Sequence, residues 1–443
     1  MFRLALKNLI SWKNSTIRKP LIIRGARQVG KTWLMKEFGK TQYAKYAYIN
    51  FENNERMKQL FNGSLEIPGI IAALQIETEL TIESHNTLLI FDEVQEVPRA
   101  LTSLKYFYEE APEYHIVSAG SLLGVALHPG TSFPVGKVEF LDLHPLDFIE
   151  FLIATGRENL NDLLIKYDTD LLRTFKMKYI EALKQYYFVG GMPEAVAAFS
   201  SRSDYSEVRS IHNNILIAYE QDFSKHAPSR IVPRIRLLWN SIPAQLAKEQ
   251  KKFIYGLMKF IYGLIKSGAR AREYELALAW LMDCGLIQKV ENISKPSVPL
   301  AAYASPGSFK LFLLDIGLLS TLSRLDIKSI LNGNTIFQEF KGALTEQFVL
   351  QQLRCNNKIL PYYWTAAKGA AEVDFVFQWG GEVVPVEVKA AENLQSKSLK
   401  SYVNKYRPKY AVRSSLSDYR KEDWLINIPL YAINRIIEFL ESD

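Results

Sequence analysis

The first third of the chain alternates short apolar runs with segments of helical spacing. Residues 20–24 form an apolar run that ends at Gly25, and residues 32–38 then place apolar side chains at helical intervals. Segments long enough for helices separate this run from four further apolar runs, over residues 45–51, 87–92, 115–121 and 137–143. Strands that alternate with helices are typical of an α/β sheet. The pattern predicts an α/β domain over residues 1–155.

Residues 156–225 change to charged and apolar positions at helical period, which predicts a helical lid region. The clear break in this region is Gly190-Gly191-Met192-Pro193. These residues would form either a hinge that transmits the nucleotide state or a turn between two helices, and the sequence favours the turn.

Residues 226–334 contain a predicted helix followed by two strands. The helix covers residues 274–283 and ends at Gly285, and apolar runs follow over 286–290 and 309–314. A helix, a turn and a two-stranded wing resemble a winged helix, a fold used both on DNA and in protein docking. The expectation is a winged-helix-like region.

Residues 335–443 return to an α/β pattern. A helix begins near residue 342, and two strands over 371–377 and 384–389 flank the turn at 380–381. Side chains alternate along a strand, so Glu387 and Lys389 lie on the same face of the second strand. A separate α/β domain is predicted here.

Composition adds little to this picture. The chain has 443 residues, 48% of them apolar and 23% charged, which fits a protein of two or three folded domains. A net charge of +7 is a weak indication of a polyanionic partner. There is no apolar run of membrane-spanning length, and Lys7 and Lys13 interrupt the N-terminal apolar segment. We therefore expect a cytoplasmic protein with no membrane partner.

The strongest chemical signal lies between the first strand and the first helix of the sheet domain. It fits the phosphate-binding pattern G-x-x-x-x-G-K-[ST] with Gly25, Ala26, Arg27, Gln28, Val29, Gly30, Lys31 and Thr32. Glycines let backbone N–H groups face phosphates, and the following helix adds its positive N-terminal end. Lys31 would reach the β- and γ-phosphates, and the hydroxyl of Thr32 would bind Mg²⁺.

A second element of such a site is a carboxylate at the end of a neighbouring strand. The apolar run over residues 87–91 ends in Asp92 and Glu93. Asp92 would complete the Mg²⁺ shell, and Glu93 would act as general base on the attacking water. The run that begins at residue 115 closes on Ser118 and Ser121, either of which would contact the γ-phosphate or serve only in a turn.

These motifs together resemble a widespread prokaryotic group of AAA-superfamily ATPases whose ATPase domain precedes a C-terminal domain of unknown function. The resemblance implies ATP as the nucleotide. The group often has an arginine near residues 134–137, where this chain has Lys137. The trans-acting arginine is therefore unassigned, with Arg99 and Arg27 as other candidates, and homo-oligomerisation stays open.

Four residues of the C-terminal region form a second candidate site. The order helix-Glu346, strand-Asp374, strand-Glu387-x-Lys389 resembles the core of PD-(D/E)xK nucleases, the restriction-endonuclease-like fold. In those enzymes the acidic residues hold Mg²⁺ and the lysine orients or activates water. An active nuclease and an inert platform of the same fold are both open.

Two functional hypotheses follow. In the first, ATP hydrolysis with Mg²⁺ is coupled to DNA binding or processing through the nuclease-like domain. In the second, the ATPase domain is a nucleotide-dependent switch, and the C-terminal part docks a protein partner without cutting nucleic acid.

Overall fold

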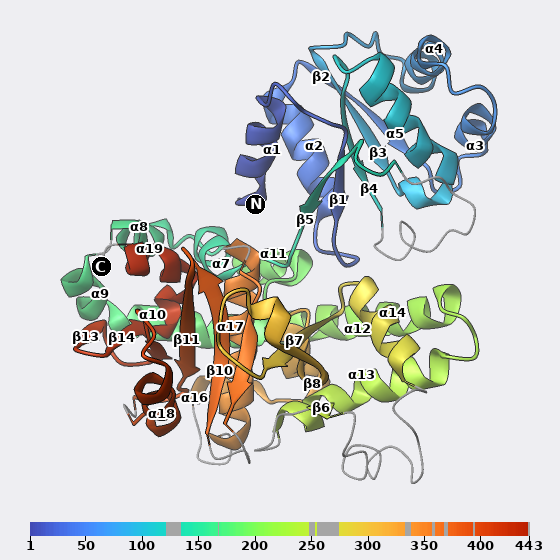
Figure 1. Cartoon of the computed structure of the whole chain (residues 1–443). Coiled ribbons are helices and arrows are strands. Elements are labelled where there is room, and N and C mark those ends of the chain that lie inside the picture. The colour runs from blue at the N-terminus through green and yellow to red at the C-terminus, as the bar shows by residue number, and fades with distance from the viewer. Residues whose placement is uncertain are drawn as a thin grey trace. The chain divides into compact units, whose positions relative to one another are not determined.

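Each of two compact units of the chain contains its own sheet. The computed structural model describes residues 1–120, 134–166, 168–247, 253–254, 274–332, 338–356, 359–366, 371–392 and 395–441. The first unit comprises residues 3–144 with 283–285, and the second comprises residues 1–2, 145–282 and 286–443. Figure 1 shows the elements of both units.

The sheet of the first unit is entirely parallel. Its strand order is β2-β3-β4-β1-β5, and every neighbouring pair runs in the same direction. The strands are β1 (Leu21–Arg24), β2 (Lys45–Asn50), β3 (Thr87–Asp92), β4 (His115–Ala119) and β5 (Glu139–Asp142). All residues of β3 and β4 are buried, as expected for inner strands that are covered on both faces. The α/β domain predicted from the apolar runs is confirmed, although this unit ends at residue 144.

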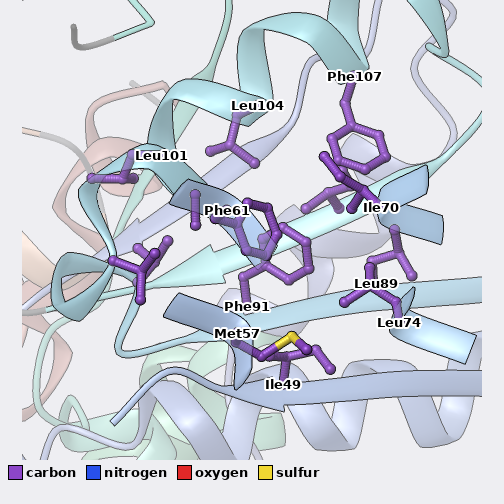
Figure 2. Packing of buried hydrophobic residues seen from close by; sticks show 14 of the residues in the cluster. Ile49, Met57, Phe61, Ile70, Leu74, Leu89, Phe91, Leu101, Leu104 and Phe107 are labelled. Carbon is purple, nitrogen blue, oxygen red and sulfur yellow. The ribbon is translucent and has the colours of Figure 1, made fainter. Parts of the chain in front are cut away.

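Helices cover both faces of this sheet. They are α1 (Ala5–Lys13), α2 (Lys31–Gln42), α3 (Glu55–Asn62), α4 (Ile67–Thr78) and α5 (Pro98–Glu110), with the short 3₁₀ helix η1 at Val94–Glu96. Figure 2 shows Ile49, Leu89 and Phe91 of the sheet packed against side chains of α3, α4 and α5. Phe61 and Phe91 meet edge to face with ring centroids 5.9 Å apart. This core fixes the end of β3, where Asp92 lies.

The second unit begins with a series of helices. They are α7 (Phe148–Ala154), α8 (Glu158–Lys166), α9 (Thr169–Thr174), α10 (Lys176–Val189), α11 (Pro193–Arg202), α12 (Tyr205–His226), α13 (Val232–Ala247) and α14 (Glu275–Asp283). The helical region that we expected as a lid thus belongs to the unit that holds the C-terminal sheet.

The second sheet has nine strands in the order β13-β14-β12-β11-β10-β9-β7-β8-β6. It is mixed: β11, β12 and β14 are parallel, whereas β9, β10 and β11 are antiparallel neighbours. The strands are β6 (Phe253–Ile254), β7 (Ile287–Ile293), β8 (Ala304–Leu313), β9 (Tyr362–Thr365), β10 (Glu372–Trp379), β11 (Glu382–Val388), β12 (Val412–Ser415), β13 (Arg420–Glu422) and β14 (Leu425–Pro429). The accompanying helices are α15 (Ile316–Leu322), α16 (Ile327–Asn332), α17 (Gln338–Asn356), α18 (Lys397–Tyr406) and α19 (Ile436–Glu441), with 3₁₀ turns η3 (Leu300–Tyr303) and η6 (Leu430–Arg435).

The expected two-stranded wing is part of this sheet. Strands β7 and β8 pair antiparallel as predicted, but β7 also pairs with β9, so one sheet continues across the boundary expected at residue 334. The five residues from Phe309 to Leu313 are all buried. A free wing exposes alternate side chains, whereas an inner strand is covered on both faces. The winged-helix-like region is therefore not confirmed, and its two expected strands, β7 and β8, extend the C-terminal sheet.

The Gly190-Gly191 break is a closely packed turn between α10 and α11. The N–H of Gly191 donates to a carboxylate oxygen of Asp315 at 2.7 Å, and a Cβ on Gly190 would lie 2.1 Å from the other oxygen. Gln351 Nε2 also donates to the Asp315 carboxylate, at 3.0 Å. The structure therefore agrees with the turn between helices that the sequence favoured, and Asp315 connects this turn to α17.

Within the described part of the chain, no helix combines the length and the apolar character that crossing a membrane would require.

Candidate functional site

The phosphate-binding loop leaves β1 and enters α2 through two constrained glycines. A Cβ on Gly25 would lie 2.3 Å from the carbonyl oxygen of Leu143, so this position excludes any side chain. Gly30 caps α2 with a φ of 95°, which L-residues with side chains rarely adopt. Gln28 also has a positive φ, of 66°. The loop therefore has the backbone freedom that a phosphate cradle needs.

Lys31 lies folded back onto this loop. Its Nζ donates to the carbonyl oxygens of Gly25 at 2.8 Å and Ala26 at 2.9 Å. Burial lowers the pKa of Lys31 to about 8, although the nearby Glu93 and Asp92 carboxylates act in the opposite direction. The ammonium is thus bonded to neutral oxygens at the place where the motif puts the phosphates of a nucleotide.

Thr32 and Asp92 meet as the two motifs predict. Thr32 Oγ1 donates to Asp92 Oδ2 at 2.6 Å, which joins the start of α2 to the end of β3. Tyr48, on the neighbouring strand β2, donates its hydroxyl to the same oxygen at 3.0 Å. Asp92 is only 3% exposed. Hydroxyl and carboxylate oxygens are the hard ligands that Mg²⁺ takes, so these residues fit that ion.

Glu93 follows Asp92 in a left-handed conformation, with a φ of 52°. Its N–H donates to Asp92 Oδ1 at 3.1 Å, and its side-chain Oε2 accepts from Gln95 Nε2 at 2.5 Å. A positive φ in a residue other than glycine is uncommon and often occurs at functional sites. Sequence analysis missed Tyr48 and Gln95, which contact the two carboxylates.

The structure does not bring every predicted residue to this site. The hydroxyl of buried Ser118 donates to the carbonyl oxygen of Leu21 at 3.1 Å, so here it joins β4 to β1. A phosphate contact by Ser118 stays a prediction. Ser121 lies outside the described residues.

Two of the three candidate cations for a trans-acting role have partners within the first unit. Lys137 Nζ lies 3.0 Å from a carboxylate oxygen of Glu109. Arg99 donates to the carbonyl oxygens of Phe61 at 2.8 Å and Gly63 at 2.9 Å, where it caps the end of α3. Arg27 lies in the phosphate-binding loop and lowers the pKa of Lys31. None of these contacts indicates an arginine finger.

The four predicted residues of the C-terminal region converge. Lys389 Nζ lies 2.6 Å from Glu387 Oε1, and Asp374 Oδ2 accepts from the N–H of Val388 at 2.8 Å. Burial raises the pKa of Glu387 in spite of Lys389, and the charge of Glu346 raises it further. Strands β10 and β11, which carry Asp374 and Glu387, are neighbours in the sheet, and Lys389 directly follows β11 (Figure 1).

Sequence analysis missed the residues at the centre of this cluster. Lys310 of β8 places its Nζ 2.7 Å from Glu372 Oε1, 3.4 Å from Glu346 Oε2 and 3.8 Å from Asp374 Oδ1. A lysine inside the apolar run of residues 309–314 was the available signal, because a buried charge requires a partner. Among the described residues, no three His, Cys, Asp or Glu side chains are arranged to hold a metal ion.

Comparisons with known proteins concern the domain that contains the first of these sites. Residues 17–152 match the family described as an AAA domain, and residues 180–329 and 341–433 match two domains of unknown function, DUF8612 and DUF4143. No curated protein matches the chain. Residues 17–152 therefore form an AAA-type P-loop domain, and ATPase activity is the general activity that this assignment supports.

Several solved structures overlap the chain weakly. Aeropyrum pernix ORC1 in complex with DNA is 14% identical over 73% of this chain and 93% of its own, with a TM-score of 0.27. The Thermotoga maritima RuvB Holliday junction branch migration motor is 15% identical over 70% of this chain and 92% of its own, with a TM-score of 0.30. Pyrobaculum aerophilum Cdc6p is 13% identical over 74% and 93%, with a TM-score of 0.24. Similarities this low carry no argument about function.

Proposed function

We propose that the chain hydrolyses ATP with Mg²⁺ at the loop between β1 and α2. The observation that carries this proposal is the 2.6 Å contact between Thr32 Oγ1 and Asp92 Oδ2. It joins residues 60 positions apart, one from each nucleotide-binding motif, at the edge of the sheet where Lys31 also lies.

Each residue of this site has a role in the proposed hydrolysis that follows from its chemistry. Lys31 would exchange its two carbonyl partners for phosphate oxygens, because a negatively charged oxygen attracts the ammonium more strongly than a neutral carbonyl oxygen does. Thr32 and Asp92 would hold Mg²⁺, which neutralises phosphate charge. Glu93 would accept the proton of the attacking water, and Gln95, which donates to Glu93 Oε2, would orient that carboxylate.

The test is a pair of substitutions that separate binding from hydrolysis. Lys31→Ala is expected to lose ATP binding, whereas Glu93→Gln is expected to bind ATP and hydrolyse it slowly. Binding of a fluorescent ATP analogue and single-turnover release of phosphate measure the two steps. Hydrolysis that persists in Lys31→Ala, or that proceeds without a divalent ion, would refute the proposal.

We further propose that nucleotide turnover is coupled to DNA binding on the C-terminal sheet unit. The supporting observation is an exposed basic surface on and after α18, which we call the α18 surface. A depression of about 520 Å³ is lined by Lys397, Lys400 and Lys405, together with Ser401 and Asn404. A second depression of about 750 Å³ adds basic and aromatic side chains, among them Arg407, Lys409, Tyr410, Lys421 and Trp424, and it is also lined by the acidic Glu422 and Asp423. Basic residues interleaved with aromatic rings fit a nucleic acid backbone and unpaired bases.

DNA binding would be measured as a mobility shift at low salt, together with stimulation of ATP hydrolysis. Lys400→Glu/Lys405→Glu should weaken binding strongly and reduce its dependence on salt. Lys178→Glu/Lys225→Glu, which makes the same charge change at exposed positions elsewhere in the unit, is the matched control. If DNA neither shifts nor stimulates the wild type, a nucleotide-dependent protein-docking role replaces this proposal.

A further inference from the structure

Lys310 is a fully buried lysine whose partners are acidic residues of the C-terminal candidate site. Its side chain is 0% exposed, and its Nζ lies within 3.8 Å of oxygens from Glu346, Glu372 and Asp374. These carboxylates come from α17 and β10, whereas Lys310 comes from β8, at least 36 residues earlier in the chain. The fold therefore inserts a cation from one segment into an acidic cluster formed by two others.

The charge of Lys310 is firmly held. Burial alone would lower the pKa of a lysine, but the charges of Glu346, Glu372 and Asp374 raise the pKa of Lys310 well above its ordinary value. The ammonium also lies 5.1 Å from the ring centroid of Tyr363. The surroundings of Lys310 therefore hold a cation, because three carboxylates lie at ion-pair distance from its ammonium and an aromatic ring lies beside it.

The neighbouring pair of Lys389 and Glu387 shows which ion the ammonium of Lys310 replaces. Lys389 is bonded to Glu387 Oε1, while Glu387 Oε2 is buried and has no hydrogen-bond partner within the described residues. Lys389 is therefore bonded to Glu387, and it also interacts electrostatically with Asp374 and Glu346. The acidic side chains of this cluster need a second cation besides Lys389. The ammonium of Lys310 supplies it, in the position that a divalent ion would otherwise take.

We propose that Lys310 is the resident cation of this cluster and closes the nuclease-like site to divalent metal ions. Removal of its charge would open a Mg²⁺ or Mn²⁺ site whose ligands come from Glu346, Glu372 and Asp374. The carboxylate oxygens lie 2.7 to 3.8 Å from Nζ, so the ammonium occupies the space between them, and among the described residues no three acidic side chains are arranged to hold a metal ion. As built, the cluster stabilises the junction of β8, β10 and α17 and does not assemble a metal-dependent nuclease.

This proposal is independent of ATP hydrolysis, and its test uses no nucleotide. Mn²⁺ binding to the full chain would be titrated by the loss of the free-ion electron paramagnetic resonance signal. Wild type should show no site that depends on Asp374. Lys310→Met should gain one Mn²⁺ site that is on the order of tenfold tighter or more than any in wild type, and Lys310→Met/Asp374→Asn should lose it.

Lys289→Met is the matched control, because Lys289 is a lysine of the adjacent strand β7 that pairs with Glu291 at 2.6 Å. It should gain no Mn²⁺ site. A folded Lys310→Met protein that binds no Mn²⁺ would overturn the proposal. A wild-type Mn²⁺ site that disappears in Glu387→Gln or Asp374→Asn would also overturn it, because the residual negative charge would then hold a metal beside Lys310.

Circular dichroism establishes whether Lys310→Met folds. If Lys310→Met folds only when Mn²⁺ is present, the proposal is supported directly, because the metal ion then compensates the carboxylates in place of the ammonium. If Lys310→Met stays unfolded with and without Mn²⁺, the double variant Lys310→Met/Glu372→Gln removes one uncompensated charge and takes its place. If neither variant folds, the Mn²⁺ titration of the wild type still tests the proposal, because a wild-type site that depends on Asp374 would overturn it.

Discussion

The two lysine–carboxylate sites of this protein differ in what their central lysine contacts. In the first unit, Lys31 donates to two neutral carbonyl oxygens, and burial lowers its pKa to about 8. In the second unit, Lys310 lies among three carboxylates that raise its pKa. A lysine held by neutral groups is ready for an anionic ligand, whereas a lysine held by carboxylates already has its counter-charge. The comparison separates a lysine that is available to a ligand from a lysine that is already paired with carboxylates.

The largest expected effect tests the chemistry of the first site. Glu93→Gln should reduce single-turnover ATP hydrolysis by roughly 10²- to 10⁴-fold while ATP binding is retained, because the amide no longer accepts a proton. Glu96→Gln, an exposed position three residues later, is the matched control and should hydrolyse ATP normally. Equal rates in the two variants would remove Glu93 from the mechanism.

Loss of the internal cation should destabilise the second unit. Lys310→Met, without added metal, should lower the free energy of unfolding by about 3–5 kcal/mol, because it removes the buried ammonium that pairs with buried Glu346 and with partly buried Glu372 and Asp374. Lys176→Met removes a more exposed lysine, paired with Glu392 at 2.6 Å, and should cost about 1 kcal/mol or less. Urea denaturation, followed by the fluorescence of the tryptophans, measures both. Similar losses of unfolding free energy in Lys310→Met and Lys176→Met would contradict the proposal that Lys310 is the resident cation of the cluster.

The contacts around Asp92 should tune the metal requirement of ATP hydrolysis. Tyr48→Phe removes one hydrogen bond to Asp92 Oδ2 and keeps the aromatic ring, over which Lys36 Nζ lies 3.7 Å from the centroid. The Mg²⁺ concentration for half-maximal hydrolysis should rise by roughly 10-fold, as for other residues that orient a metal ligand. Tyr46→Phe, on the same strand, should leave it unchanged.

An effect of similar size is a dependence of ATP affinity on pH. Phosphates bind the charged form of Lys31, so affinity should be full below pH 8 and fall as the pH rises through about 8. From pH 7 to pH 9 the dissociation constant should rise by about tenfold, since the charged fraction falls by that factor. A wild-type affinity that is constant over this range would contradict a lowered pKa.

Much of the first site was predictable because its signals are local. Residues 25–32 are contiguous, so the motif alone located the loop. Asp92 ends an apolar run with the pattern of an inner strand, so the run located this carboxylate at the end of a strand. Tyr48 and Gln95 were not predictable, since a strand tyrosine and a loop glutamine have many ordinary roles. Their contacts depend on how β2 lies beside β3 and on the turn after Glu93.

The second site was only partly predictable. Alternation along a strand placed Glu387 and Lys389 on one face, and they are bonded to each other. Lys310 was missed because its partners lie 36 or more residues away and are brought to it by β7 and β8 joining the C-terminal sheet. The prediction of a free wing concealed that arrangement. A single charge in the apolar run of residues 309–314 was the only local sign of it.

The most direct test of the contrast between the Lys31 site and the Lys310 site is a count of bound Mn²⁺. The number of ions per wild-type chain would be measured with and without a non-hydrolysable ATP analogue. The account predicts one tightly bound ion with the analogue, lost in Lys31→Ala, and none without it. A tightly bound ion that persists without nucleotide and disappears in Asp374→Asn would contradict it, because the second site would then be a metal centre despite Lys310.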